Sequence, residues 1–561
     1  MLSGQIKLAA FLIFMSAVGL GGSLLEQERY RYSDFDPQPM PMVAASVAGG
    51  GVEHCGPWVR DGYVSVQVNV DAYGCNIVGD AANEPSIAID PSKPRKIVIG
   101  WRQFDTVLSD FRQAGWGYSH DGGHTWVFPG TLDPGVFGTD PVLASDGDGR
   151  IFYLTTDYAA TRVFRSDDGG LTWPVEALIE PRLWDKAWMA VDRTDGVGRG
   201  NVYVMSPAFA RSSDGGQTFA VGPEWAVFAH MSVARDGTFY VVSTPPRGAP
   251  GANIKWSSNA QDPNQAAEFS PQIDFAMGGT LRYQGPPNPV GLLAQPWVAI
   301  DESDSERRGC LYVLASIVPD RSDETDVHFV RSTDGGVTWS DPIRVNDDTI
   351  GNGAWQWFGM MSLAPNGRID AAWNDTRSSE DAVYSELFYS YSLDGGENWS
   401  KNVPVSPQFN SHVGWPQQAK IGDYYHMISD NLGVNIAYAA TFNNEQDVYF
   451  LRIGPHDCNG NEIPDEDDIT AETSLDCNGN AVPDECEYRA DFDGDSLTTL
   501  DDHAHFVNCQ QGTTPLNSPL GKGGGSARVA PDLGCCALFD MEPDGDIDLR
   551  DFSFLQRAFA P

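Results

Sequence analysis

One short string, of the form S-x-D-G-G-x-T-W, recurs five times in this 561-residue chain. The copies are YSHDGGHTW (118–126), RSDDGGLTW (165–173), RSSDGGQTF (211–219), RSTDGGVTW (331–339) and YSLDGGENW (391–399). An active site is needed once, whereas a structural unit is repeated. The recurrence therefore predicts a building block of the fold.

Each residue type in the string has a structural use. The Asp can accept hydrogen bonds from the backbone of its own turn, and the two glycines allow positive φ in a tight hairpin. The closing Trp or Phe can pack between neighbouring units. We therefore interpret the five acids as turn residues and not as catalytic residues: Asp121, Asp168, Asp214, Asp334 and Asp394.

The string belongs to a longer unit of about 40–60 residues, a period typical of propellers and solenoids. Seven units each begin with a short apolar segment, at 84–90, 140–146, 187–192, 230–236, 295–301, 358–365 and 424–430. A second segment follows, a third runs into the string, and a fourth leaves it. Helical periodicity is absent from these segments. The sequence therefore predicts an all-β, seven-bladed β-propeller, with six blades as the alternative.

Two units depart from the pattern. The fourth has only the decayed copy IKWSSNAQD (254–262), and the seventh lacks the string because the chain leaves after its third segment, 447–453. The alternating segment YVSVQVNV (63–70) precedes the first unit. We expect it to supply the missing strand and close the ring, which removes an open sheet edge.

The string resembles the Asp-box, or BNR repeat, of sialidases and of a broader set of sialidase-like propellers. The resemblance covers residues 63–453 and implies the propeller fold. Family sialidases have six blades, bind the sugar carboxylate with three arginines, the first in a [FY]-R-I-P motif, and use a Tyr nucleophile with Glu and an Asp acid/base. Here KPRKI (93–97) does not match that motif, and no Tyr/Glu pair can be assigned.

The predicted topology places a ligand site on one face. The repeated strings join third and fourth strands, so the first-strand starts and the 2–3 loops lie on the opposite face, around the channel mouth. Candidate catalytic residues there are Arg102, Asp140, Asp185, Arg377 and Asp423. Two such carboxylates could hydrolyse a glycosidic bond, and the arginines could bind an acidic sugar. Further polar residues on this face are Glu84, Asp105, Asp157, Arg162, Lys186, His230 and Asp375, beside the aromatic stretch WQWF (355–358).

Three hypotheses remain open for this face. The acids and bases could pair with one another across blades, since ion-pair networks also collect at propeller mouths. The face could cleave glycans as a sialidase-like glycoside hydrolase. It could instead bind a glycan or an extracellular protein without catalysis. The net charge of −41 argues against nucleic acid as a partner.

The chain starts with one Lys and an apolar run that ends near residue 25. This pattern predicts a secretory signal over 1–25, with an uncleaved N-terminal anchor as the alternative. Residues 26–62 are expected to form a linker. We predict a secreted or extracytoplasmic, cell-surface protein, which touches a membrane only if the anchor stays.

Nine cysteines fit an exported protein. We expect a local Cys55–Cys75 bridge and a buried free thiol at Cys310. Cys458, Cys477 and Cys486 should pair among themselves or with a spare cysteine. A bridge from Cys509 to Cys535 or Cys536 would close the insert between them.

The composition changes after Gly454: residues 456–561 hold 23 Asp+Glu against 5 Lys+Arg. Four twelve-residue stretches place oxygen side chains at positions 1, 3, 5, 9 and 12, as EF-hand-type calcium loops do. The alternative is an acidic disordered tail. The predicted Ca²⁺ ligands are Asp457, Asn459, Asn461, Asp465 and Asp468; Asp476, Asn478, Asn480, Asp484 and Glu487; Asp491, Asp493, Asp495, Thr499 and Asp502; and Asp540, Glu542, Asp544, Asp548 and Asp551.

The tail has two further resemblances. The two D-C-N-G-N-x-x-P-D loops within 455–490 resemble thrombospondin type 3 repeats. Residues 491–561, in which two loops each precede an apolar helical pattern, resemble the dockerin module, which implies a cohesin-like partner. The chain departs from dockerins by the long insert 510–536 and by Asp546 at position 7 of the second loop.

Overall fold

The structure is a computed structural model, and it describes residues 51–486 apart from 181, 182, 184, 227, 246–248, 282, 283, 322, 477 and 478, together with residue 503. The chain divides into two units, Met1–Ala45 and Ser46–Pro561, and the described residues all belong to the second. The predicted signal lies outside them. Among the described residues, no helix is long and apolar enough to cross a membrane.

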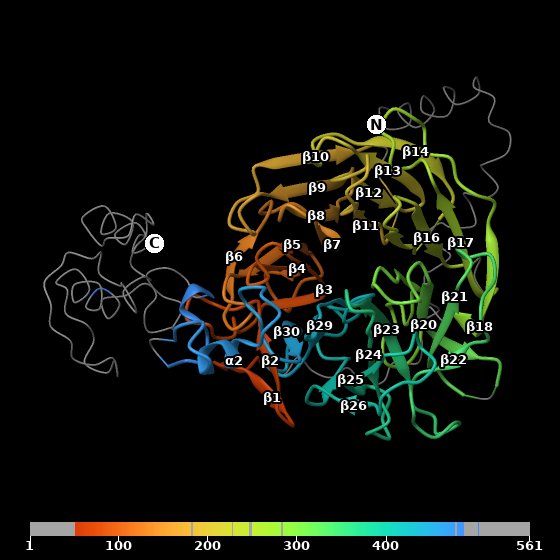
Figure 1. The fold of residues 1–561 in the computed structure, drawn as a ribbon. Helices are drawn as coiled ribbons and strands as arrows, with labels where there is room; N and C mark the ends of the chain where they lie inside the picture. The colour runs from red at the N-terminus through yellow and green to blue at the C-terminus, as the bar shows by residue number, and fades with distance from the viewer. Residues whose placement is uncertain are drawn as a thin grey trace, which may run out of the picture. The chain divides into compact units, whose positions relative to one another are not determined.

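The described strands pair into six antiparallel sheets, which follow one another around a common centre in Figure 1. Three are four-stranded in chain order. They contain β3 (Ala81–Ile89), β4 (Ile97–Phe104), β5 (Gln113–Ser119) and β6 (Val127–Thr131); β7 (Thr139–Ser145), β8 (Ile151–Thr156), β9 (Thr161–Ser166) and β10 (Val175–Ile179); and β11 (Trp188–Val191), β12 (Val202–Met205), β13 (Ala208–Ser212) and β14 (Ala220–Glu224).

A fourth sheet of eight strands joins two such runs through pairing of β18 with β20. The fifth sheet is β23 to β26 with β27 beside β25. The bounds are β15 (His230–Val233), β16 (Phe239–Ser243), β17 (Pro250–Ser257), β18 (Ile273–Leu281), β19 (Trp297–Ile300), β20 (Leu311–Pro319), β21 (Asp326–Ser332), β22 (Ile343–Arg344), β23 (Gln356–Leu363), β24 (Ile369–Asp375), β25 (Tyr384–Ser392), β26 (Val403–Pro404) and β27 (Phe409–Asn410).

The sixth sheet joins the two ends of the strand series. It holds β28 (His426–Ser429), β29 (Val434–Ala440), β30 (Asp447–Ile453), β2 (Tyr63–Gln67) and β1 (Trp58–Arg60). Ser65 pairs with Leu451, and Gln67 with Tyr449. The prediction that an early strand completes the last sheet is therefore confirmed. The sheet starts earlier than expected, because β1 lies in the stretch predicted as linker.

The first strands of successive runs contact one another in sequence, from β3 and β7 through to β28, which contacts β3 again. This arrangement of antiparallel sheets is that of a β-propeller, so the predicted fold class is confirmed. The predicted blade number stays a prediction, because one sheet joins two of the four-stranded runs.

The repeated string forms the hairpin that was expected of it. In RSTDGGVTW, the backbone amides of Val337 and Thr338 donate to Asp334 Oδ1, at 3.1 and 2.8 Å. Ser332 Oγ donates to the same oxygen at 2.8 Å and accepts from the Gly336 amide at 2.9 Å. The acid is therefore fully used by its own turn, as in the other four copies.

The hairpins also attach four-stranded runs to the preceding runs. Trp339 stacks on Phe275 at 4.0 Å, and Trp399 meets Phe329 at 5.4 Å, each across a boundary between runs. The second glycine has φ of +84° at Gly396, where an added Cβ would lie 2.1 Å from Phe329. Positive φ and close approach together require glycine at that position. The predicted packing between units is confirmed.

Aromatic and imidazole side chains fill the centre of the propeller, between the first strands of the successive runs. Trp188 lies 5.2 Å from Trp297 and 5.1 Å from Tyr424, centroid to centroid. His230 lies 4.5 Å from Trp297, and burial lowers the pKa of His230 to about 3. These neutral, packed rings make the centre a hydrophobic core.

After β30 the described chain holds one short helix, α2 (Asp465–Thr470), and a 3₁₀ turn, η3 (Asp484–Cys486). Disulfides join Cys55 to Cys75 and Cys458 to Cys486, and Cys310 is a buried free thiol. These three cysteine predictions are confirmed. Cys477, Cys509, Cys535 and Cys536 lie outside the described residues.

Candidate functional site

Four of the five predicted site residues gather where the first strands begin. Glu84, the fourth residue of β3, and Asp140, the second residue of β7, both have left-handed φ, of 59° and 54°. The loops before β11 and β28 supply Asp185 with Lys186, and Asp423. One oxygen from each of Glu84, Asp140 and Asp423 lies within 4.8 Å of the others. We call Glu84, Arg102, Asp140, Asp185, Lys186, Lys420 and Asp423 the charged cluster.

Lys186 is the hub of this cluster. Its Nζ lies 2.6 Å from Asp423 Oδ2, 2.5 Å from Asp185 Oδ1 and 3.4 Å from Asp140 Oδ1. The Lys186 side chain is 5% exposed, so burial alone would lower its pKa, but the carboxylates of Asp140, Asp185 and Asp423 raise it well above the ordinary value. Lys186 therefore stays charged and joins side chains from three sheets.

Arg102, on β4, pairs inside its own sheet. Its Nε lies 2.6 Å from Glu84 Oε2 and donates to Asn83 Oδ1 at 2.7 Å. Burial raises the pKa of Glu84 from 4.5 to about 7. Asp423 is equally buried, but Lys186 and Lys420 hold its pKa below the ordinary value, since Lys420 forms a second ion pair with it. Two neighbouring carboxyl groups therefore have opposite pKa shifts.

The cluster is largely closed to solvent. The side chains of Glu84, Asp140 and Asp423 are at most 3% exposed, whereas Asp185 is 38% exposed. The neighbouring Trp188 and Tyr424 rings pack the centre. The arrangement can hold three sheets together through ion pairs, as the first of the three hypotheses expected, while Arg102 and Glu84 pair within a fourth. It presents a single half-exposed carboxylate to solvent.

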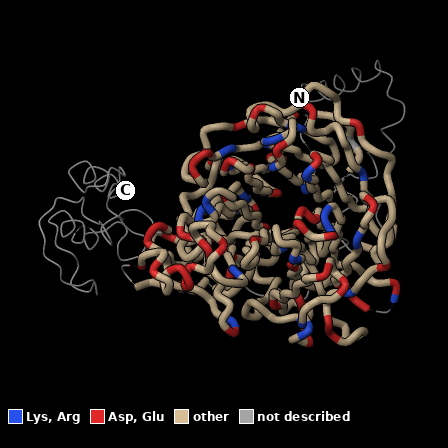
Figure 2. The backbone as a smooth tube through the Cα atoms, in the orientation of Figure 1, with Lys and Arg blue, Asp and Glu red and all other residues tan. Residues whose placement is uncertain are grey.

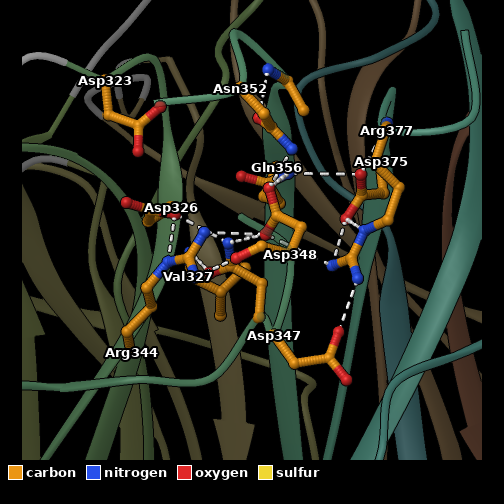
Figure 3. Close-up of polar contacts among 12 residues, drawn as sticks. Asp323, Asp326, Val327, Arg344, Asp347, Asp348, Asn352, Gln356, Asp375 and Arg377 are labelled. Carbon is orange, nitrogen blue, oxygen red and sulfur yellow. Dashed lines mark hydrogen bonds and ion pairs between the residues drawn. The ribbon is translucent and has the colours of Figure 1, made fainter. Parts of the chain in front are cut away.

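Arg377 lies apart from this cluster, in a second polar network between β21 and β24 that Figure 3 shows. Its Nη1 lies 2.6 Å from Asp347, and its Nη2 2.8 Å from Asp375. Arg344 pairs with Asp326 at 2.6 Å and with Asp348 at 2.7 Å in the same network. The structure therefore does not bring the two predicted arginines together as one sugar-binding pair. Around the ring, acidic and basic residues are interspersed in the same way (Figure 2).

Two other expectations for this face need correction. WQWF was placed among the surface residues, yet Trp355, Trp357 and Phe358 are buried in the core. A register shift between Trp357 and Met360 in the pairing of β23 with β24 accompanies the left-handed φ of Phe358. His230 likewise belongs to the packed centre and not to the rim.

Sequence reasoning missed an exposed aromatic patch, which we define as Leu108, Phe111, Phe137 and Tyr158. Phe137 stacks on Tyr158 at 4.1 Å and meets Phe111 edge-on at 6.2 Å. Tyr158 is 75% and Leu108 77% exposed. The patch lies on the β4–β5, β6–β7 and β8–β9 loops, opposite the repeated hairpins. Apolar residues inside otherwise polar loops, as in VLSDF (107–111), were the available signal.

The first tail loop folds around its predicted ligands. Asp457 accepts the Gly460 and Asn461 amides, at 2.8 and 3.1 Å. Asn459 and Asn461 both donate to Asp468 Oδ2, so positions 3, 5 and 12 converge. Positions 9 to 12 lie in α2, which the sequence did not predict. Asp476 accepts the Gly479, Asn480 and Ala481 amides in the second loop.

Most of the remaining predicted ligands lie beyond the described residues. Asp484 lies in η3. Those outside are Asn478, Glu487, Asp491, Asp493, Asp495, Thr499, Asp502, Asp540, Glu542, Asp544, Asp548 and Asp551. The calcium and dockerin predictions therefore stay predictions.

No family model matches the chain, and no curated protein matches it. Among solved structures, YCF48 from Cyanidioschyzon merolae is 12% identical, with 70% of this chain and 98% of that chain covered and a TM-score of 0.41. A protein of unknown function from Dyadobacter fermentans DSM 18053 is 14% identical, with 71% and 99% covered and a TM-score of 0.38. The Hadza microbial sialidase Hz136 is 15% identical, with 66% and 65% covered and a TM-score of 0.34. Our fold assignment rests on strand order and register.

Proposed function

We propose that the protein is an exported, seven-bladed propeller that binds glycans at the aromatic patch and does not cleave them at the charged cluster. The blade number follows if the two halves of the eight-stranded sheet are counted as two blades. Tyr158 is 75% and Phe111 37% exposed, and the half-buried Phe137 supports Tyr158 by stacking. Exposed rings of this kind suit stacking against the apolar faces of sugar rings. Exposed aromatic residues that gather on loops are typical of binding surfaces.

One observation carries the proposal: the apolar groups that could meet a ligand are exposed, while most acids of the charged cluster are buried and paired. A glycosidase needs its acid and its nucleophile or base beside the scissile bond. Glu84 and Asp423 are sealed by their neighbours, and Asp140 is bound to Lys186.

Hydrolysis is the second candidate, and a specific observation favours it. Two carboxyl groups with pKa values shifted apart are the usual pair for acid and base roles. Glu84, with a pKa of about 7, would be the acid, and ionised Asp423 would be the nucleophile or base. This function requires the cluster to open to substrate.

The test is a glycan screen of the full chain that records both binding and released sugar. We expect binding without release, and weaker binding in Phe111→Ala and Tyr158→Ala. Tyr73→Ala removes an equally exposed tyrosine outside the patch and serves as the matched control. Sugar release that is lost in Glu84→Gln and Asp423→Asn would establish the hydrolase and overturn the binding proposal.

The tail would hold the propeller in place outside the cell. The alternating oxygen side chains of its loops support calcium binding, and the dockerin resemblance suggests a cohesin-like partner. Calcium-dependent capture of the tail by such a partner, abolished by chelation, is the expected result. Capture that persists in a chelator would contradict this part of the proposal.

A further inference from the structure

A second group of buried acids lies where the ring closes. Asp80 directly precedes β3, and Glu445 and Asp447 lie at the turn into β30. Their exposed fractions are 5%, 2% and 0%. One oxygen from each lies within 4.8 Å of the other two. We call Asp80, Glu445 and Asp447 the closure cluster.

Each partner that the structure shows for these carboxylates is electrically neutral. Gln103 Nε2 donates to Asp80 Oδ2 at 2.8 Å, and Asn69 and Asn443 donate to the two oxygens of Asp447, both at 2.9 Å. Glu445 accepts from the Asn76 side chain at 2.7 Å and from the Gly79 amide at 2.9 Å. The Tyr449 hydroxyl also donates to Asp447, at 3.4 Å. Three acids are therefore held together by neutral groups, and buried charge needs a counter-charge.

Two buried oxygens beside these acids have no hydrogen-bond partner among the described residues: Asp80 Oδ1 and Asn443 Oδ1. Gln103 already occupies the other oxygen of Asp80, and Asn443 donates its amide to Asp447. Oxygens that stay unsatisfied at 5% and 1% exposure call for an explanation, and an ion is one. Asp80 can therefore offer a free carboxylate oxygen to an ion, and Asn443 an amide carbonyl.

We propose that the closure cluster binds one Ca²⁺ ion. Calcium takes six to eight oxygen ligands at about 2.3–2.6 Å, so oxygens on opposite sides of the ion lie roughly 5 Å apart. The spacing of the three carboxylate oxygens falls within that limit. Carboxylates with amide carbonyls form the hard, all-oxygen set that calcium prefers, and Mg²⁺ would require a tighter octahedron of about 2.0–2.1 Å.

The ion would bind where the two ends of the propeller ring meet. It would join the stretch before β3 to the β29–β30 turn, beside the pairing of β2 with β30 that completes the last sheet. Asn69 and Asn76, which donate to two of the acids, lie between β2 and β3. Asn69 is inside the segment closed by the Cys55–Cys75 disulfide, and Asn76 directly follows it. Calcium at this position would stabilise the ring closure.

The experiment uses the full chain with its predicted tail loops silenced by Asp457→Asn, Asp476→Asn, Asp491→Asn and Asp540→Asn. Native mass spectrometry counts bound Ca²⁺, and thermal unfolding measures its effect. We expect one bound ion and a higher unfolding temperature in Ca²⁺ than in a chelator. Adding Asp80→Asn should remove both effects, whereas Asp274→Asn, at an exposed strand position, should keep them.

The count in the silenced chain needs no change in the propeller, so a count of zero is conclusive even if Asp80→Asn fails to fold, and Glu445→Gln then serves as the second variant. No bound ion overturns the proposal. An ion that persists in both Asp80→Asn and Glu445→Gln lies elsewhere and overturns it as well. Stronger binding of Mg²⁺ than of Ca²⁺ overturns the choice of metal.

Discussion

The two buried acidic clusters use different means to neutralise similar charge. In the charged cluster, Lys186, Lys420 and Arg102 pair with the carboxylates. The shown partners of the closure cluster are amides and the Tyr449 hydroxyl, all of them neutral. Successive residues of β4 serve the two groups, Arg102 the first and Gln103 the second. Because side chains alternate along a strand, one strand supplies a cation to one cluster and an amide to the other.

This difference indicates which of the two clusters requires a bound cation. The charged cluster carries its own counter-charges, so it can be complete as folded. The closure cluster surrounds its acids with neutral hydrogen-bond donors and leaves Asp80 Oδ1 without a partner among the described residues, so a cation completes it. Burial and the presence of several acids do not distinguish the two clusters; the charge of their partners does.

Removing the hub of the charged cluster should have the largest effect. Lys186→Met leaves three carboxylates without their shared cation, and breaking a buried ion pair costs about 3–5 kcal/mol. We expect the free energy of unfolding, from urea denaturation, to fall by that amount. Lys401→Met, at an exposed lysine, should change it by only about 0.5 kcal/mol or less. Equal losses in the two variants would show that the cluster does not depend on its cation.

Calcium removal should have the next largest effect, and only the closure cluster should respond. In the tail-silenced chain, Ca²⁺ at 100 times its Kd stabilises by about 2.7 kcal/mol, which a chelator removes. The tail-silenced chain that also carries Lys186→Met should lose the same stabilisation, about 2.7 kcal/mol, when a chelator removes the ion, because Lys186 has a separate set of partners. A chelator effect that disappears with Lys186→Met would show that the ion sits in the charged cluster instead.

Much of the fold was predictable because the repeat states it seven times. The segment that became β8, for example, has a counterpart after the first segment of every unit, and the missing fourth strand of the last unit pointed to β2. WQWF was misplaced because a first strand is buried on both faces, so its apolar run does not alternate. The short α2 was missed since four of its six residues are acidic.

The pairing inside the site was less predictable. The prediction that one face of the propeller holds Arg102, Asp140, Asp185 and Asp423 correctly placed them together, because the first strands converge at their starts. It could not separate Arg377, whose partners come from a different pair of sheets. Nor did it identify the closure cluster, since Asp80 and Asp447 are joined only by ring closure, which brings distant residues together.

The pH dependence of stability should distinguish a protonated acid from a paired one. Burial raises the pKa of Glu84 from 4.5 to about 7, so between these values the folded protein holds a proton that the unfolded chain has released. Stability therefore falls as pH rises through this window, by at most about 1.4 kcal/mol per pH unit. Glu84→Gln should remove this part of the slope, measured by urea denaturation at constant Ca²⁺. An unchanged slope would mean that Glu84 is already ionised in the folded protein.

The smallest effect is expected at the exposed edge of the charged cluster. Asp185 lies 2.5 Å from Lys186 Nζ but is 38% exposed, so water already screens the pair. Asp185→Asn should lower the free energy of unfolding by less than about 1 kcal/mol, because Asp140 and Asp423 still hold the lysine. Asp423→Asn, at the same lysine but buried, is the matched comparison and should cost several times more. If the two substitutions lower the free energy of unfolding equally, the exposed Asp185 and the buried Asp423 do not differ in their contribution to stability. Asp185 would then be the residue through which a substrate could contact the cluster.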